Sequence, residues 1–120
     1  MSIIIVALPK MEDAKRIRKI LMSHGFENVV SCSTASAALI EVNKEHRGLI
    51  ISGYKLPDMH YTQLRDCMPA YYEMLLMASP NVVSSAGGDV MAVTMPVKIY
   101  DLVNTVEMLL IQIERRYKKD

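Results

Sequence analysis

Five short runs of hydrophobic residues recur along the chain, and their composition predicts β-strands. The first run, residues 3–8, is continuous and rich in β-branched side chains, which is typical of a strand buried on both faces of a parallel sheet. The other runs predict strands at residues 28–32, 49–52, 74–78 and 90–94. The pattern therefore supplies the strands for one five-stranded sheet.

Between the first runs the apolar positions recur three and four residues apart, which predicts amphipathic helices. One helix begins at Met11 and is expected to end at Gly25, because glycine favours the backbone conformation that closes a helix. Ser33 or Thr34 offers a hydroxyl group to cap the next helix, which continues to Val42.

The remaining helices differ in length. A short helix is expected over residues 61–68, and the strongest periodicity, over residues 99–117, predicts an extended last helix. Residues 84–88 read Ser-Ser-Ala-Gly-Gly, which favours a short or degenerate fourth helix. Strands that alternate with helices pair in parallel and are covered on both faces. We therefore predict an α/β fold of the flavodoxin-like (βα)5 type, a doubly wound five-stranded parallel sheet.

The composition excludes several classes of protein. A chain of 120 residues suffices for one domain with its own core, and a formal net charge of +1 argues against a surface that binds nucleic acid throughout. Cys32 and Cys67 are too few for a disulfide framework. No run is long enough for a secretory signal or a membrane-spanning helix, so we expect a cytoplasmic protein with no membrane contact.

The expected carboxyl ends of the strands, where ligands bind in doubly wound folds, carry little chemistry. Residues 7–9, 52–54, 77–79 and 94–96 include no carboxylate, lysine, histidine or cysteine. A divalent metal therefore lacks ligands, and acid–base or nucleophilic catalysis lacks its groups. We expect no metal, no cofactor and no enzymatic activity.

The third strand and the loop after it resemble a known family. Residues 48–59, Gly-Leu-Ile-Ile-Ser-Gly-Tyr-Lys-Leu-Pro-Asp-Met, are similar to the corresponding segment of response-regulator receiver domains, and Thr-Met-Pro at residues 94–96 resembles the family's Thr-Lys-Pro. The resemblance extends over residues 2–113. It implies a domain of two-component signal transduction, in which an aspartate beside a magnesium ion accepts a phosphoryl group.

In that register the residues of the phosphorylation site are replaced. Gly53 stands where the phosphoacceptor aspartate is expected, Met95 where the lysine is expected, and Met77 where the switch threonine or serine is expected. Leu8 and Pro9 take the place of the acidic pair that holds magnesium. The resemblance therefore implies a pseudo-receiver, whose degenerate phosphorylation pocket is filled partly by flexible apolar methionine side chains.

Two alternatives stay open. In the first, the domain is a receiver phosphorylated at a non-standard residue, Ser52 or Asp58, although neither would have a metal site beside it. In the second, it is a small-ligand-binding flavodoxin-like module. The loop Leu-Pro-Lys-Met at residues 8–11 lacks the Ser, Thr and Gly residues expected to bind a flavin phosphate.

Other segments narrow the resemblance. Leu-Pro-Asp-Met-His-Tyr at residues 56–61, Met-Leu-Leu-Met-Ala-Ser-Pro at residues 74–80, and a long last helix with a basic end are similar to the receiver-like half of transcription antitermination regulators that carry an ANTAR RNA-binding domain. This resemblance implies that residues 1–113 form the receiver-like domain. Residues 114–120 would then be a basic helical extension towards an output domain absent from this chain, through which alone RNA would be bound.

The last helix has an apolar face wide enough for two surfaces. One side is expected to pack on the sheet, whereas Val103, Leu110 and Tyr117 have the spacing of a coiled-coil seam. We therefore expect a homodimer through this helix. Regulation would act through assembly, a protein partner or a ligand.

Overall fold

One open sheet forms the centre of the structure, a computed structural model that describes residues 2–85 and 90–119. Within these residues, five parallel strands pair in the order β2-β1-β3-β4-β5, which confirms the predicted doubly wound arrangement. Their bounds are β1 Ile3–Ala7, β2 Val29–Cys32, β3 Gly48–Gly53, β4 Tyr72–Ala78 and β5 Met91–Thr94. The largest difference from the expected strands is at β4, which begins at Tyr72 instead of Met74.

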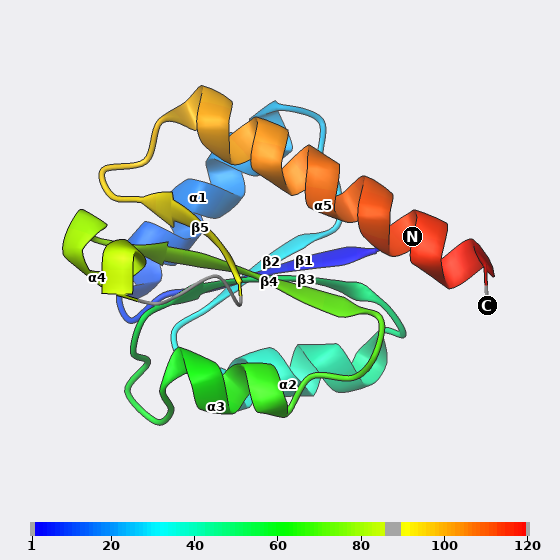
Figure 1. The fold of residues 1–120 in the computed structure, drawn as a ribbon, viewed down its shortest axis with the longest axis horizontal. Helices are drawn as coiled ribbons and strands as arrows, with labels where there is room; N and C mark the ends of the chain where they lie inside the picture. The colour runs from blue at the N-terminus through cyan, green and yellow to red at the C-terminus, as the bar shows by residue number, and fades with distance from the viewer. Residues whose placement is uncertain (1, 86–89, 120) are drawn as a thin grey trace.

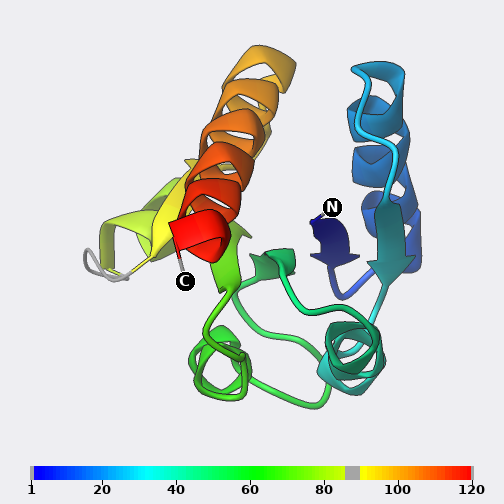
Figure 2. The same ribbon diagram turned by 90° about the vertical axis from the view of Figure 1, so that its right-hand side faces the viewer.

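Helices cover both faces of the sheet. On one face lie α1 (Met11–Ser23) and α5 (Ile99–Lys119), and on the other lie α2 (Ala35–Lys44) and α3 (Tyr61–Asp66) (Figure 1, Figure 2). α4 (Pro80–Ser85) is six residues long and contacts β4 and β5. The short fourth helix and the extended last helix are confirmed, while residues 86–88 of the stretch that suggested the short helix lie outside the described residues.

The predicted helix boundaries have a physical basis in the structure. Gly25 follows α1 with a φ of 96°, the left-handed region that favours glycine, and its N–H donates to the carbonyl of Met22. Thr34 caps α2, because its hydroxyl oxygen accepts a hydrogen bond from the N–H of Ala37 at 3.1 Å. Local sequence signals therefore determine where these helices begin and end.

Two hydrophobic cores, one on each side of the sheet, explain the continuous apolar run of β1. Ile4 and Val6 belong to the core beneath α1 and α5. Ile3, Ile5 and Ala7 point to the opposite core, beneath α2 and α3. A strand covered on both faces needs hydrophobic residues at every position, because successive side chains point to opposite faces.

At the amino end of β3 the backbone passes too close to its neighbours for any side chain. Gly48 pairs with Ile3 of β1 and with Tyr72 of β4. A Cβ atom on Gly48 would lie 2.6 Å from Cγ2 and from the carbonyl oxygen of Ile3, and 2.8 Å from the Tyr72 ring. Glycine at this position allows the three central strands to approach one another.

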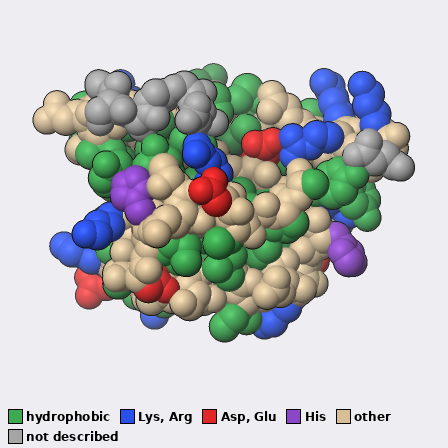
Figure 3. All heavy atoms as spheres, turned by 60° about the horizontal axis from the view of Figure 1, so that its bottom comes forward, with side chains coloured by type: hydrophobic (Ala, Val, Ile, Leu, Met, Phe, Trp, Pro, Cys, Tyr) green, Lys and Arg blue, Asp and Glu red, His purple; other side chains and the backbone are tan. Residues whose placement is uncertain are grey.

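The face covered by α2 and α3 mixes charged side chains of both signs with hydrophobic ones, and Lys and Arg side chains gather towards the C-terminal end of the molecule (Figure 3).

None of the helices that the structure describes combines the length and the hydrophobicity needed to cross a membrane.

Candidate functional site

A cavity of about 360 Å³ opens at the carboxyl ends of the central strands. It lies beside the topological switch point between β1 and β3, where successive strands begin to be added on the other side of β1. This is the usual ligand site of a doubly wound fold. The structure brings all five residues of the predicted degenerate pocket together in its wall: Leu8, Pro9, Gly53, Met77 and Met95. They come from four different strand ends or the loops after them, and they meet because parallel strands end at the same edge.

Backbone hydrogen bonds fix the loops that carry these residues. The N–H of Leu8 donates to the carbonyl of Cys32 at 3.2 Å, which holds the end of β1 against β2. The N–H of Met95 donates to the carbonyl of Ala78 at 2.8 Å, and the peptide bond that follows, Met95–Pro96, is cis. Met77 is buried at the end of β4, whereas Met95 is 37% exposed at the mouth of the cavity.

Pro9 closes the space above Gly53. A Cβ atom on Gly53 would lie 3.1 Å from Cδ of Pro9 and 3.7 Å from Cδ2 of Leu8. The first distance is tighter than most real contacts of a Cβ atom, so a larger residue here requires Pro9 to move. Pro9 therefore leaves slightly too little room for a Cβ atom at position 53 and would have to shift by a few tenths of an ångström.

The polar groups at this cavity come from positions that the sequence analysis did not single out. Asp13, Lys55 and Ser79 also line the wall. Asp13 already interacts with Arg16, with 3.5 Å between the Asp13 Oδ1 and Arg16 Nη1 atoms. Within residues 2–85 and 90–119, no group of three or more His, Cys, Asp or Glu side chains is arranged to hold a metal ion. The cavity is therefore mainly hydrophobic, with a polar rim.

Ser52, one of the two alternative phosphate acceptors, does not reach the cavity. Its side chain is fully buried, and its hydroxyl donates to the carbonyl of Gly53 at 2.9 Å. A phosphoryl donor from solvent has no access to that oxygen.

Asp58, the other alternative acceptor, caps the start of α2. Its carboxylate accepts hydrogen bonds from the N–H of Ala35 at 2.8 Å, the N–H of Ser36 at 3.0 Å and the hydroxyl of Ser36 at 2.7 Å. The Ala35 N–H, followed by the two donors of Ser36, lowers the pKa of the Asp58 carboxyl to about 2. The carboxylate thus links the loop after β3 to α2, and both of its oxygens have partners.

The predicted seam on α5 is only partly open. Leu110 packs against the core beneath α1 and α5. Tyr117 lies under the guanidinium of Arg47, 4.1 Å from the Arg47 Cζ atom to the ring centroid, and edge-on to Tyr71 at 5.2 Å between centroids. Val103 is partly exposed. Of the three residues, Tyr117 departs most from the expectation, because it packs on its own chain instead of projecting outward.

An ion pair fastens the end of α5 to the sheet. Glu114 accepts hydrogen bonds from Arg47 Nε at 2.6 Å and from the Ser2 hydroxyl at 2.5 Å. These two donors, Arg47 first, lower the pKa of the Glu114 carboxyl to about 2. Two residues further along, Arg116 donates hydrogen bonds to the Glu73 carboxylate at 2.6 Å and to the carbonyl of Ala70 at 3.1 Å. None of these contacts was expected from the sequence.

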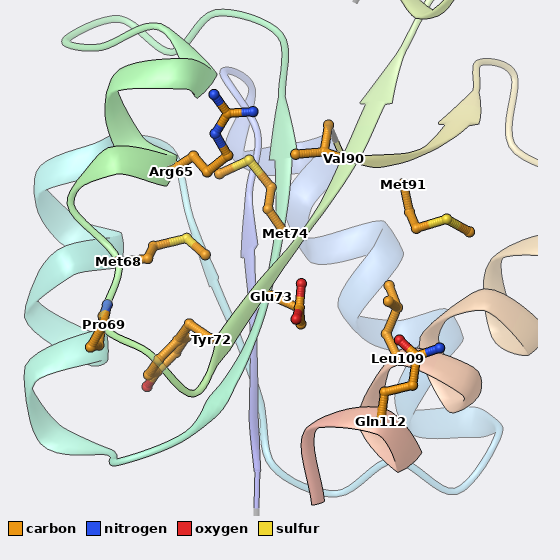
Figure 4. A pocket seen from close by; sticks show the side chains of 10 residues that line it. All are labelled: Arg65, Met68, Pro69, Tyr72, Glu73, Met74, Val90, Met91, Leu109 and Gln112. Atoms are coloured by element: carbon orange, nitrogen blue, oxygen red, sulfur yellow. The ribbon is translucent and has the colours of Figure 1, made fainter. Parts of the chain in front are cut away.

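A second cavity, of about 290 Å³, lies at the opposite edge of the sheet (Figure 4). Its wall includes three methionines, Met68, Met74 and Met91, from the end of α3 and the starts of β4 and β5. Glu73 also lines it and is held by Arg116. Most of its side chains already serve in packing or in this ion pair, so it adds no reactive group.

Comparison with known proteins places the fold. No protein-family model and no curated protein matches the chain. Among solved structures, it is similar to the signal receiver domain of an HD domain-containing protein from Pseudomonas fluorescens Pf-5, with a TM-score of 0.82, 17% identity, and coverage of 99% of this chain and 93% of that one.

Two further structures agree. The signal receiver domain of a signal transduction histidine kinase from Syntrophus aciditrophicus matches with a TM-score of 0.78 and 21% identity over 96% of this chain and 94% of that one. A response regulator receiver domain protein from Clostridium thermocellum matches with a TM-score of 0.75 and 15% identity over the full length of both chains. The chain therefore has the fold of response-regulator receiver domains, with a hydrophobic cavity at the carboxyl edge of its sheet.

Proposed function

We propose that this domain is a phosphorylation-deficient receiver-like signalling module that acts through protein contacts and is not an enzyme. The observation that carries the proposal is the position of Pro9 over Gly53. The residue at the end of β3 has no side chain to accept a phosphoryl group, and the Cδ atom of Pro9 lies 3.1 Å from the place that its Cβ atom would take.

Phosphoryl transfer to a carboxylate makes demands that this cavity does not meet. It needs the carboxylate itself, a cation to neutralise the transferring oxygens, and a positive group to hold them. Leu8 and Pro9 offer a magnesium ion no ligand side chain, and Met95 offers an uncharged thioether. Lys55 and Asp13 also lie in the wall, but the Asp13 carboxylate comes from α1 and already pairs with Arg16 at 3.5 Å.

The alternatives have weaker support. Ser52 is buried, and the oxygens of Asp58 are engaged with the start of α2. The hydrophobic cavity has room for a small apolar molecule, which keeps the ligand-binding module as the second candidate. Such a ligand would be the input of the same signalling domain.

The output that we propose is control of RNA-binding antitermination. The support is the resemblance of residues 56–61 and 74–80 to ANTAR-type regulators, together with the basic residues that end α5. The domain would form a homodimer, receive a regulatory protein or ligand, and position an RNA-binding output domain joined to α5. We expect it to work in the cytoplasm, where Cys32 and Cys67 would stay as the free thiols of the structure.

The test is titration with magnesium and beryllofluoride, a mimic of the phosphoryl group, followed by amide chemical shifts. The unmodified chain is expected to show no localised shifts. A matched variant with Leu8→Asp, Pro9→Asp, Gly53→Asp and Met95→Lys restores the missing groups and serves as the positive control. Saturable shifts centred on Gly53 and Met95 of the unmodified chain would overturn the proposal.

A further inference from the structure

The outward side of α5 carries a row of exposed residues that the protein's own core does not use. We call this row the outer stripe; its members are Asp101, Asn104, Met108, Ile111, Arg115 and Lys118. They follow one another at alternating steps of three and four residues, which places them along one line of a helix. The buried residues of the same helix, including Leu102, Leu109 and Ile113, lie on the side that faces the sheet.

The centre of the outer stripe is hydrophobic. Met108 is 39% exposed and Ile111 is 44% exposed, although both are large apolar side chains on a well-formed helix. Beside Ile111, a hollow of about 370 Å³ has a hydrophobic floor of Phe26, Leu110 and Ile111, and charged residues complete its wall: Glu107, Glu114, Arg115 and Lys118. A hydrophobic centre flanked by polar residues is the usual arrangement of a protein contact surface.

The charges of the outer stripe are divided between its two ends. Its amino-terminal end has Asp101 and Asn104, and its carboxyl-terminal end has Arg115 and Lys118. A surface that carries both signs at opposite ends is complementary to itself after a two-fold rotation, which is the requirement of a symmetric dimer interface.

The geometry points to an antiparallel pairing of two α5 helices through their outer stripes, with a second copy of this chain as the occupant. In an antiparallel coiled-coil register that brings Met108 opposite Ile111 of the second copy, Asn104 meets Arg115 and Asp101 meets Lys118. Each contact occurs twice by symmetry, with the two hydrophobic layers at the centre, the Asn104–Arg115 contacts beside them and the Asp101–Lys118 charge pairs at the ends.

A parallel pairing of the same stripe is disfavoured by charge. It would place Arg115 against Arg115 and Lys118 against Lys118, and Asp101 against its own copy. Like charges that face each other across an interface oppose association. The charge distribution therefore selects the orientation as well as the partner.

This inference rests on the homodimer of the proposed function and specifies its interface. It places that interface on the outer stripe instead of the seam expected from the sequence. The seam expected at Val103, Leu110 and Tyr117 is partly covered by the chain itself, whereas Met108 and Ile111 are open. An antiparallel pair also sends the two α5 ends, and whatever follows them, in opposite directions. Because only two large apolar side chains of each copy meet, we expect a weak dimer whose population rises with protein concentration.

The first test uses charge-reversed chains in sedimentation velocity. In one variant, Asp101→Lys with Asn104→Lys, every charged residue of the outer stripe is basic, and in the other, Arg115→Glu with Lys118→Glu, every charged residue is acidic. Each alone is expected to stay monomeric at concentrations where the unmodified chain dimerises, and their equimolar mixture is expected to dimerise again. Glu41→Lys with Lys44→Glu exchanges a surface pair on α2, on the other face of the sheet, and should leave dimerisation unchanged.

The second test determines the orientation by disulfide cross-linking in a Cys67→Ser background, since Cys67 is exposed and Cys32 is buried. Antiparallel pairing predicts that chains with Asn104→Cys and chains with Arg115→Cys cross-link when mixed and not separately. Cross-linking of each variant with itself would show a parallel pair and overturn the inference.

Two other outcomes overturn it in distinguishable ways. A dimer that survives both charge-reversed variants would refute the outer stripe as the interface while leaving the proposed homodimer intact. An unmodified chain that remains monomeric at every concentration would refute the homodimer itself. The outer stripe would then be a binding surface for a different protein.

Discussion

Pro9 and Gly53 are in close contact, because the Cδ atom of Pro9 lies only 3.1 Å from the position that a Cβ atom on Gly53 would take. A residue larger than glycine at position 53 would therefore press against the ring of Pro9.

The first prediction concerns this contact. Gly53→Asp is expected to lower the free energy of unfolding by about 1 kcal/mol, because Pro9 must shift by a few tenths of an ångström to admit the new Cβ atom. The same substitution in a Pro9→Ala background should cost clearly less, since the obstacle is gone. Denaturant unfolding of the four proteins in a double-mutant cycle measures the coupling. An equal cost in both backgrounds would show that Pro9 is not the obstacle.

The second prediction concerns Gly48, where the neighbours of a Cβ atom include backbone. Gly48→Ala should destabilise the protein by about 3 kcal/mol, because β1 must shift away from β3 to make room. Gly25→Ala is the matched control: nothing lies within 4 Å of its Cβ position, so only its left-handed backbone is penalised, by about 1 kcal/mol. Thermal and urea unfolding compare the two. A Gly48→Ala protein as stable as Gly25→Ala would contradict the close approach of the strands.

Acid sensitivity of the α5 attachment is the third prediction. The folded pKa of Glu114 is about 2, below the ordinary value of 4.5, so its stabilising effect is complete above pH 4.5 and is lost as the pH falls towards 2. Glu114→Gln should therefore be less stable than the unmodified chain at neutral pH, and the difference should shrink across this window. Unfolding at a series of pH values tests it.

The control for this pH series is Glu12→Gln, at the exposed first turn of α1. It changes the same type of residue without touching the Arg47 and Ser2 contacts. If both variants alter the acid limb to the same extent, the Glu114 network does not produce the effect.

The fourth prediction concerns the Tyr72 hydroxyl, which donates to the carbonyl of Glu45 at 3.0 Å and ties β4 to the end of α2. Burial first, and the charge of Glu45 second, raise the pKa of Tyr72 to about 12 from its ordinary value of 10.0. Stability from this group is therefore present below pH 10.0 and is lost as the pH rises towards 12.

Tyr72→Phe should lower the free energy of unfolding by about 1 kcal/mol at neutral pH. The variant should also lose less stability than the unmodified chain as the pH rises from 10 to 12. Tyr54→Phe, at a tyrosine that is 40% exposed, is the control for removing a hydroxyl. Absorbance titration of the folded protein measures the ionisation directly. A Tyr72 that ionises in the folded protein near pH 10 would contradict its burial.

Local patterns predicted the strands, the glycine that ends α1 and the threonine cap of α2, because each depends on neighbouring residues. The meeting of Leu8, Gly53 and Met95 was also predictable, since parallel strands end at a common edge. That these residues form one cavity needed only the fold class and the positions of the strand ends.

Long-range side-chain contacts were not predictable in the same way. Asp58 was considered as a phosphate acceptor, yet it caps a helix whose first residues lie more than twenty positions earlier in the chain. Tyr117 has the right helical spacing for an outward seam, but Arg47 and Tyr71 from distant segments cover it. Periodicity identifies the apolar side of a helix and carries no information about which chain segment lies against it.

The attachment of α5 gives the domain a mechanical property. The helix begins three residues after Pro96, next to the strand-end cavity, and spans about 30 Å to the amino ends of the strands. There, Ser2 and Arg47 hydrogen-bond to Glu114, and Glu73 accepts a hydrogen bond from Arg116. A pull on the carboxyl end of α5 would therefore be shared by the starts of β1, β3 and β4, so that the helix transmits force into the centre of the sheet instead of peeling away from it.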